Sequence, residues 1–247
     1  MTDSRPERPR LRGLVVDWGG VLTASLDEAM GQWARADGVD MEHFRIVMRG
    51  WVGARPKEAP PGGGGAVPQD GAVAALEQAA DAGPAGTSPV HQLERGELAP
   101  GEFERELAGE LAQQGSPVRA EGLLGRMLGG LATLDDDMLG LVRRARTAGV
   151  RTALLSNSWG DHYPEELWDG LFDAVVISGR VGMRKPDERI FRHTAELLGL
   201  EPAECVMVDD LPHNVAGAVA SGMVGVRHTS YATTRDELEA LLGLPPA

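Results

Sequence analysis

The sequence predicts an α/β protein with a parallel, doubly wound sheet and a helical insertion after the first strand. Apolar runs typical of buried strands alternate with helical segments throughout the second half of the chain. One more such run, Leu14 to Asp17, stands near the start and ends in an acid followed by Gly19 and Gly20. The segment between them has mainly helical periodicity. The expected units are a Rossmann-like core, residues 11–23 with 134–247, and a helical insertion, residues 24–133.

The composition excludes some classes of partner. The chain has 247 residues, 42% of them hydrophobic, and a formal net charge of -13. This length accommodates one α/β unit and a smaller insertion. The acidic excess argues against nucleic acid and anionic membrane surfaces as partners, because both bind through Lys and Arg. A small anionic substrate stays open, since one metal ion and one lysine can reverse the local field.

Cysteine usage and the first residues indicate the compartment. The single cysteine, Cys205, excludes a disulfide within the chain, and its place inside a predicted strand is typical of core packing. The start of the chain is charged and Pro-rich and lacks the apolar core of a signal peptide. No apolar run approaches the length of a membrane span. We therefore expect a soluble cytoplasmic protein.

The insertion is predicted to contain helices and one flexible segment. Apolar residues recur at spacings of three and four in residues 26–34, 44–51 and 103–111. Residues 53–87 are instead rich in Gly, Ala and Pro. Such a composition buries too little apolar surface to offset the cost of ordering. We expect this segment to be flexible.

The second half of the chain alternates strands and helices. A helix is predicted from Asp135, because three successive acids suit the positive end of a helix dipole, and it ends at Gly149. Another helix begins at Pro186 and ends at Gly199. The strands predicted here are residues 150–155, 174–177, 205–208 and 224–227.

Polar residues gather at the ends of these elements. Beside Asp17 they are Ser156, Asn157, Lys185, Asp209 and Asp210. If the strands are parallel, all of them lie at one edge of the sheet, where open α/β sheets bind their ligands. A carboxylate nucleophile, a hydroxyl, a cation and a pair of acids make a coherent site for phosphoryl transfer.

Each of these residues has a chemical role in such a reaction. Asp17 is ionised at neutral pH and can attack phosphorus to form an acyl phosphate. A Mg²⁺ ion held by Asp17 and Asp210 would screen the two anions from each other. Lys185 would balance the remaining charge, and Ser156 would bind phosphoryl oxygens. Asn214 would orient Asp210 or bind a metal-bound water.

Each residue also has a structural explanation. An Asp at a strand end is often a helix cap or a turn former, Ser156-Asn157 alone is an ordinary turn, and a lysine is usually solvated. The adjacent acids Asp209 and Asp210 are harder to explain in this way, because they repel each other unless a positive group lies beside them. Four histidines show no metal-ligand spacing and are expected at the surface or at caps: His162, His193, His213 and His228.

Taken in order, these residues resemble the motifs of the haloacid dehalogenase superfamily of aspartate-nucleophile hydrolases. The four motifs are Asp17-Trp18-Gly19-Gly20-Val21, Leu155-Ser156-Asn157, Gly182-Met183-Arg184-Lys185-Pro186, and Val208-Asp209-Asp210 with Asn214. Residues 93–97, followed by Phe103, together with residues 182–186, look most like the branch with bacterial sugar-phosphate phosphatases and the N-terminal phosphatase domain of soluble epoxide hydrolases. In that branch the insertion is a helical cap that closes over the active site and selects the substrate.

The resemblance implies a role for each matching residue. Asp17 would be nucleophile and metal ligand, Asp210 the second protein ligand, and the carbonyl of Gly19 the third. The usual phosphatase pattern has an Asp at position 19 as general acid, and a general acid is typically worth about 10² to 10⁴ in rate. Glycine there leaves three alternatives: a slow phosphatase, a substrate with a good leaving group such as an anomeric sugar phosphate, or lost activity.

Three functions therefore stay open. The leading one is a Mg²⁺-dependent phosphatase that hydrolyses a small phosphorylated metabolite through an aspartyl-phosphate. A non-catalytic module that binds phosphate and metal is the second, and a metal-independent dehalogenase, disfavoured by the Asp209-Asp210 pair, is the third. The insertion would select the substrate and is a candidate dimer contact. Its candidate residues, which packing explains equally well, are Trp33, Trp51, Glu94 and Arg95; Trp18 and Trp159 are candidates for the pocket entrance.

Overall fold

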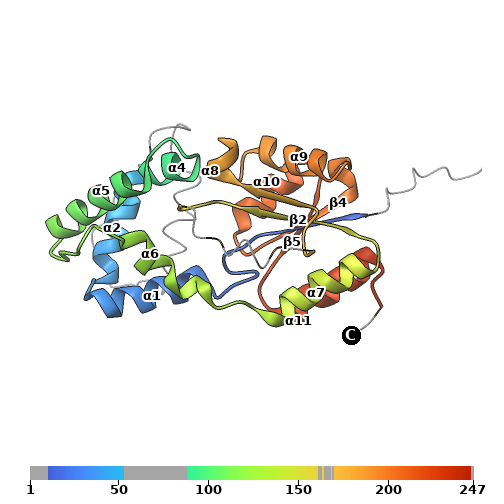
Figure 1. Ribbon diagram of the computed structural model, residues 1–247, viewed down its shortest axis with the longest axis horizontal. Coiled ribbons are helices and arrows are strands. Elements are labelled where there is room, and N and C mark those ends of the chain that lie inside the picture. The colour runs from blue at the N-terminus through green and yellow to red at the C-terminus, as the bar shows by residue number, and fades with distance from the viewer. Residues whose placement is uncertain (1–10, 53–87, 161–162, 164–167, 169, 246–247) are drawn as a thin grey trace, which may run out of the picture.

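The computed structural model describes residues 11–52, 88–160, 163, 168 and 170–245, and it shows two lobes side by side (Figure 1). A core contains the sheet, and a helical lobe lies beyond one edge of it. The predicted flexible segment, residues 53–87, and His162 lie outside the described residues.

The core sheet has five parallel strands in the order β3-β2-β1-β4-β5. β1 (Gly13–Val16) lies at the centre, between β2 (Arg151–Ser156) and β4 (Cys205–Asp209), and the edges are β3 (Ala174–Ile177) and β5 (Val224–Arg227). Each predicted strand is present within one residue of its predicted bounds. The parallel, doubly wound sheet is confirmed.

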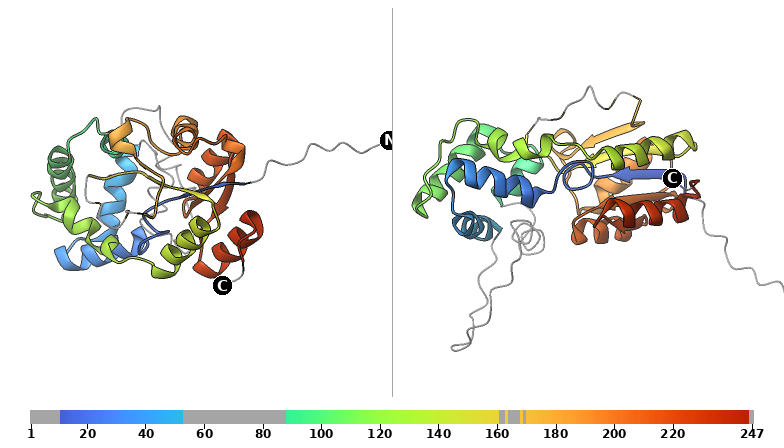
Figure 2. Two further views of the ribbon diagram at one scale, coloured as in Figure 1. Left: turned by 45° about the vertical axis from the view of Figure 1, so that its right-hand side comes forward. Right: turned by 90° about the horizontal axis from the view of Figure 1, so that it is seen from below.

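Helices cover both faces of the sheet (Figure 2). On one face lie α7 (Asp136–Thr147) and α11 (Tyr231–Leu242), and on the other lie α9 (Glu188–Leu197) and α10 (Pro212–Ser221); α8 (Ser178–Val181) and the 3₁₀ turn η3 (Pro202–Glu204) are short connectors. Leu14 and Val16 pack with α7, whereas Val15 packs with α9, because successive side chains of a strand point to opposite faces. Both faces of β1 are therefore buried, as its continuous apolar run requires.

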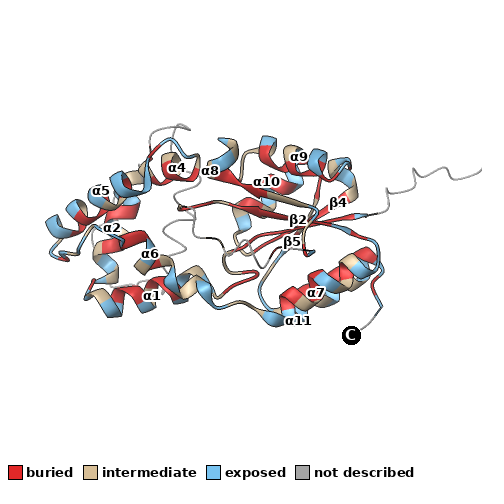
Figure 3. Cartoon of the chain, viewed as in Figure 1, coloured by how far each residue is buried: buried red, intermediate tan, exposed pale blue. Residues whose placement is uncertain are grey.

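The helical lobe has a hydrophobic core of its own (Figure 3). Its elements are α1 (Leu26–Asp37), α2 (Met41–Val52), α4 (Pro89–Glu94), α5 (Pro100–Gln113), α6 (Leu123–Leu128) and the 3₁₀ turn η1 (Gly129–Ala132). Trp33 and Trp51 pack inside this lobe against Phe44 and Phe103, with ring centroids 5.5 and 5.3 Å apart. Packing thus accounts for both tryptophans. None of the described helices in either lobe is long and apolar enough to cross a membrane.

The chain crosses between the lobes twice at one place. Thr23, on the way out, and Leu134, on the way back, form an antiparallel bridge. The amide of Ala24 donates to the carbonyl of Thr133, and the amide of Asp135 donates to the carbonyl of Leu22, at 3.1 and 2.9 Å. The two crossing segments are therefore held together by backbone hydrogen bonds.

Candidate active site

The site begins at the carboxyl ends of the two central strands. The register pairs Val16 with Val208, and the amide of Asp17 continues the ladder by donating to the carbonyl of Val208 at 3.0 Å. Asp17 therefore follows β1 beside Asp209, the last residue of β4. Both carboxylates are buried. The sheet register alone brings these two acids together, as the strand-end pattern predicts.

Lys185 joins the two acids. Its side chain is fully buried, and Nζ lies 2.8 Å from Oδ1 of Asp17 and 2.6 Å from Oδ2 of Asp209. Burial alone would lower the pKa of Lys185, but the charges of Asp17 and Asp209 raise it above its ordinary value. The solvated lysine considered as an alternative is therefore wrong, because this ammonium is the counter-charge of two buried carboxylates.

Asn157 fixes the backbone of Lys185. The amide N–H of Lys185 donates to Oδ1 of Asn157 at 2.9 Å, and Nδ2 of Asn157 donates to the carbonyl of Lys185 at 3.1 Å. These two bonds tie the loop before α9 to the end of β2. Asn157 thus positions the lysine, whereas the sequence grouped it with residues that act on the substrate.

Asn214 contacts a different acid from the one expected. Its Nδ2 donates to both carboxylate oxygens of Asp209, at 3.0 and 3.2 Å, and not to Asp210. The reason is local, because α10 begins at Pro212 and its first turn lies directly over the end of β4. Asp209 also accepts from the amide of Leu211 at 2.9 Å. Together with Lys185, these donors occupy both oxygens of Asp209, which is consistent with a supporting role.

Asp17 and Asp210 carry charge that the lysine does not fully balance. Burial raises the pKa of Asp17 to about 7, even though Lys185 lowers it. Burial, followed by repulsion from Asp17 and Asp209, raises the pKa of Asp210 to about 8. Oxygens of the three acids lie within 4.8 Å of one another. An excess of hard oxygen donors and of negative charge at one point fits a Mg²⁺ ion.

The two glycines after Asp17 differ in what they permit. Gly20 has φ +73°, and a Cβ built there would lie 2.4 Å from Oδ2 of Asp210, so only glycine allows that carboxylate to approach. A Cβ at Gly19 would meet only Cδ1 of Leu131, at 4.0 Å. Space therefore explains Gly20 but not Gly19, and the position of the usual general acid is open.

Ser156 lies at the end of β2 and contacts a tyrosine. Its Oγ is 2.9 Å from the hydroxyl of Tyr163, and burial raises the pKa of that tyrosine above its ordinary value. Both residues line the same cavity as Asp17. No motif in the sequence marks Tyr163, so only the fold shows that it lies beside Ser156.

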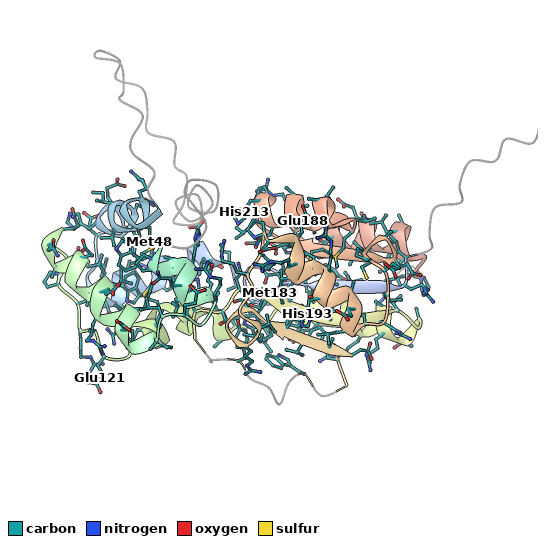
Figure 4. All side chains as sticks on the ribbon, turned by 90° about the horizontal axis from the view of Figure 1, so that it is seen from above. Met48, Glu121, Met183, Glu188, His193 and His213 are labelled. Carbon is teal, nitrogen blue, oxygen red and sulfur yellow. The ribbon has the colours of Figure 1, made fainter. Side chains whose placement is uncertain are left out.

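These polar groups form one end of a cavity of about 620 Å³ between the two lobes. Trp18 and Trp159 line it, as expected. His213 of α10 also lines it and lies at the edge of the core that faces the helical lobe, whereas His193 lies elsewhere in the core (Figure 4). His91 of α4 lines the cavity from the opposite lobe. No local pattern marks these two histidines, because only folding brings them to one wall.

Glu94 is the residue of the helical lobe that binds the core most closely. Its Oε1 accepts from the indole N–H of Trp159 at 3.1 Å, and its Oε2 accepts from Nε of Arg184 at 2.5 Å. Its backbone carbonyl accepts from the hydroxyl of Ser178 at 2.5 Å. Arg95, the neighbouring candidate, pairs instead with the exposed Glu97. One buried acid thus joins three separate segments of the core to the lobe.

Comparison with known proteins agrees with this geometry. The sequence profile described as haloacid dehalogenase-like hydrolase matches residues 11–222. A sesquiterpene phosphatase from Aspergillus oryzae is 33% identical over 157 residues, which cover 62% of this chain and 78% of that protein. A phosphoserine phosphatase from Thermus thermophilus is 42% identical, but the match covers only 33% of this chain and 35% of that one. The bifunctional epoxide hydrolase 2 of Rattus norvegicus is 28% identical over 120 residues, or 45% of this chain and 22% of that protein.

Solved structures share the fold. A dehalogenase superposes with a TM-score of 0.59 at 20% identity, covering 99% of this chain and 100% of that chain. A haloacid dehalogenase family enzyme from Bacteroides thetaiotaomicron superposes with a TM-score of 0.57 at 18% identity, covering 88% and 93%. The four sequence motifs lie together at one edge of the sheet. The profile match assigns the chain to the same family as these motifs. The protein belongs to the haloacid dehalogenase-like hydrolase family.

Proposed function

We propose that this protein is a Mg²⁺-dependent phosphatase that hydrolyses a small phosphorylated metabolite through an aspartyl-phosphate on Asp17. One observation carries the proposal: Asp17 and Asp210 line one cavity with an excess of negative charge, and Lys185 binds the nucleophile directly. The phosphatases among the relatives support it. The Bacteroides enzyme has also been crystallised with magnesium and inorganic phosphate.

Asp17 is oriented for attack by two donors. Lys185 and the amide of Trp18 both bind Oδ1, at 2.8 and 2.7 Å, so Oδ2 is the oxygen available to the phosphorus. In the first step a bond forms between Oδ2 and phosphorus, and the ester P–O bond breaks. The leaving oxygen takes its proton from water, because Gly19 carries no acid. Water then attacks phosphorus, which breaks the bond to Asp17 and releases inorganic phosphate.

The remaining residues hold the phosphoryl group and the ion. Asp17, Asp210 and the carbonyl of Gly19 would hold Mg²⁺, which neutralises the phosphate so that two anions can approach each other. Ser156 would donate to a phosphoryl oxygen. Lys185 holds Asp17 in place and lowers the pKa of this buried acid, which favours its ionised form.

Replacement of the nucleophile tests the proposal. Asp17→Asn keeps the shape of the side chain and should lower Mg²⁺-dependent turnover of p-nitrophenyl phosphate by at least about 10³-fold. The matched control is Asp136→Asn, an exposed acid at the start of α7, which should keep wild-type turnover. Circular dichroism checks that both variants fold. Undiminished turnover by Asp17→Asn would exclude Asp17 as nucleophile.

The glycine at position 19 favours a second candidate, a non-catalytic module that binds phosphate and metal. A panel of phosphate esters assayed with Mg²⁺ and with EDTA separates the two. Metal-dependent turnover above background excludes the module, whereas phosphate binding without turnover supports it. Halide release from a haloalkanoic acid without metal would instead indicate the dehalogenase.

A further inference from the structure

We propose that the side of the cavity formed by the helical lobe binds a hydrocarbon group, so that the substrate is the monophosphate ester of an apolar alcohol. This inference rests on the proposed phosphatase function and extends it to the leaving group. The apolar chamber, as we call this side of the cavity, is lined by Leu26, Val90, Leu128 and Leu131 of the lobe, and Trp18 and Trp159 of the core line the same cavity.

The wall of the chamber offers little to a hydroxylated substrate. Leu26 begins α1, Val90 lies in α4, and Leu128 and Leu131 lie at the end of α6 and in η1. One apolar side chain from each of four segments of the lobe therefore lines the cavity. Sugar hydroxyl groups placed against these four side chains would lose hydrogen bonds to water without replacement. A hydrocarbon would gain from leaving water.

The charged groups of the lobe side are already neutralised. Glu94 is paired with Arg184 and accepts from Trp159 as well. Burial and the charge of Arg184 lower the pKa of His91 to about 4, so this imidazole is neutral near pH 7. Among the described lobe residues that line the cavity there is no Lys or Arg. A second phosphate or a carboxylate on the leaving group would therefore find no lysine or arginine contributed by the described part of the lobe, and Arg184 of the core is already paired with Glu94.

Gly19 completes the boundary between reaction site and chamber. A side chain at this position would project toward Leu131, and an acid there would place a charge beside the apolar wall. Glycine keeps the boundary uncharged, although the leaving group then receives no proton from this position. Binding of the hydrocarbon supplies energy that can be used at the reacting phosphorus.

A series of 4-alkylphenyl phosphates tests the chamber. The acidity of the phenol stays nearly constant from 4-methyl to 4-butyl, so only the apolar tail changes. Because burying one methylene is worth about fourfold, kcat/KM should rise about 60-fold across the three added methylenes. The polar control is 4-(2-hydroxyethyl)phenyl phosphate, which matches the propyl ester in size and should be at least about tenfold slower.

Two variants locate the effect. Leu131→Asn puts an amide into the chamber and should remove most of the dependence on tail length. Ile46→Asn, an exposed position of α2 outside the cavity lining, should keep it. Thermal unfolding confirms that both variants are folded. An unchanged dependence in Leu131→Asn would overturn the placement of the tail.

The outcomes separate this inference from the function on which it rests. Phosphate release with rates that are flat or fall with tail length overturns the chamber and leaves the phosphatase intact. No phosphate release from any ester overturns the phosphatase. In that case calorimetry with the 4-alkylphenylphosphonates decides about the chamber, which predicts about fourfold tighter binding per methylene and is excluded by constant affinity.

Discussion

The two ends of the cavity are built in opposite ways. At the reaction end, Asp17 and Asp209 lie at strand ends, and Lys185 from the loop before α9 binds them at 2.8 and 2.6 Å. At the lobe end, leucine and valine side chains of α1, α4, α6 and η1 line the wall. Sheet register therefore brings the acids of one end together, and the inserted helices line the opposite end of the cavity.

Their charges differ as well. Three acids share one lysine at the reaction end, which leaves negative charge for a cation. At the lobe end Glu94 and Arg184 balance each other one to one. The reaction end therefore has unbalanced negative charge that can bind a cation. At the lobe end the two charges already neutralise each other.

Removal of Lys185 is expected to have a large effect on the reaction end of the cavity. Lys185→Met leaves two buried carboxylates without their counter-charge and should lower the free energy of unfolding by about 3–5 kcal/mol, measured by urea denaturation without Mg²⁺. Adding Asp209→Asn should restore part of the loss, because one of the two charges is then gone. A loss below about 1 kcal/mol would show that the acids do not depend on Lys185.

Glu94→Gln tests the lobe end. It keeps the size of the side chain but removes the charge opposite Arg184, and it should lower the free energy of unfolding by about 2–3 kcal/mol. The matched control is Glu97→Gln, which breaks the exposed pair with Arg95 and should cost at most about 1 kcal/mol. Equal effects of the two substitutions would mean that burial of the Glu94 pair does not matter.

Gly20 and Gly38 have nearly the same positive φ. Substitutions at these two positions can therefore separate the effect of backbone strain from that of a steric collision. Gly20→Ala and Gly38→Ala both force alanine into φ near +70° and should each cost about 1–2 kcal/mol of stability. Only at Gly20 would the new methyl group collide with Asp210, since Gly38 has open space around it. Gly20→Ala should therefore raise the Mg²⁺ concentration for half-maximal activity at least about tenfold. If Gly38→Ala changed that concentration equally, the collision would not be the cause.

The pH dependence of stability follows from the raised pKa values of two acids at the reaction end. In the metal-free protein, Asp17 and Asp210 have pKa values of about 7 and 8, above the value of 3.8 for a free side chain. The folded state then holds more protons than the unfolded state between about pH 4 and 8, so stability falls as pH rises through this range. Mg²⁺ displaces these protons and should raise Tm more at about pH 8.5 than at about pH 5.5. The Asp210→Asn variant should lose most of that difference, and an equal rise at both pH values would contradict the predicted titration.

The reaction end could be predicted from the sequence, but the lobe end could not. Parallel strands bring their carboxyl ends to one edge, so the apolar runs placed Asp17, Ser156 and Asp209 without further information. The hydrogen-bond partner of Asn214 could not be predicted in the same way. A side chain in the first turn of a helix can reach either of two adjacent acids. The chamber depends on α4 and α6, six-residue helices too short for a clear period. Glu94 and Arg184 are 90 residues apart in the sequence, so no local pattern indicates their contact.

The bridge between Thr23 and Leu134 has a consequence for engineering. Because the outgoing and returning segments are hydrogen-bonded to each other, everything from residue 24 to residue 133 leaves and rejoins the sheet at a single point. A helical unit of another shape can be grafted at this junction while β1 keeps its register with β2 and β4. Exchange of this unit is expected to change the lobe side of the cavity, while the acids keep the positions that the strand register gives them.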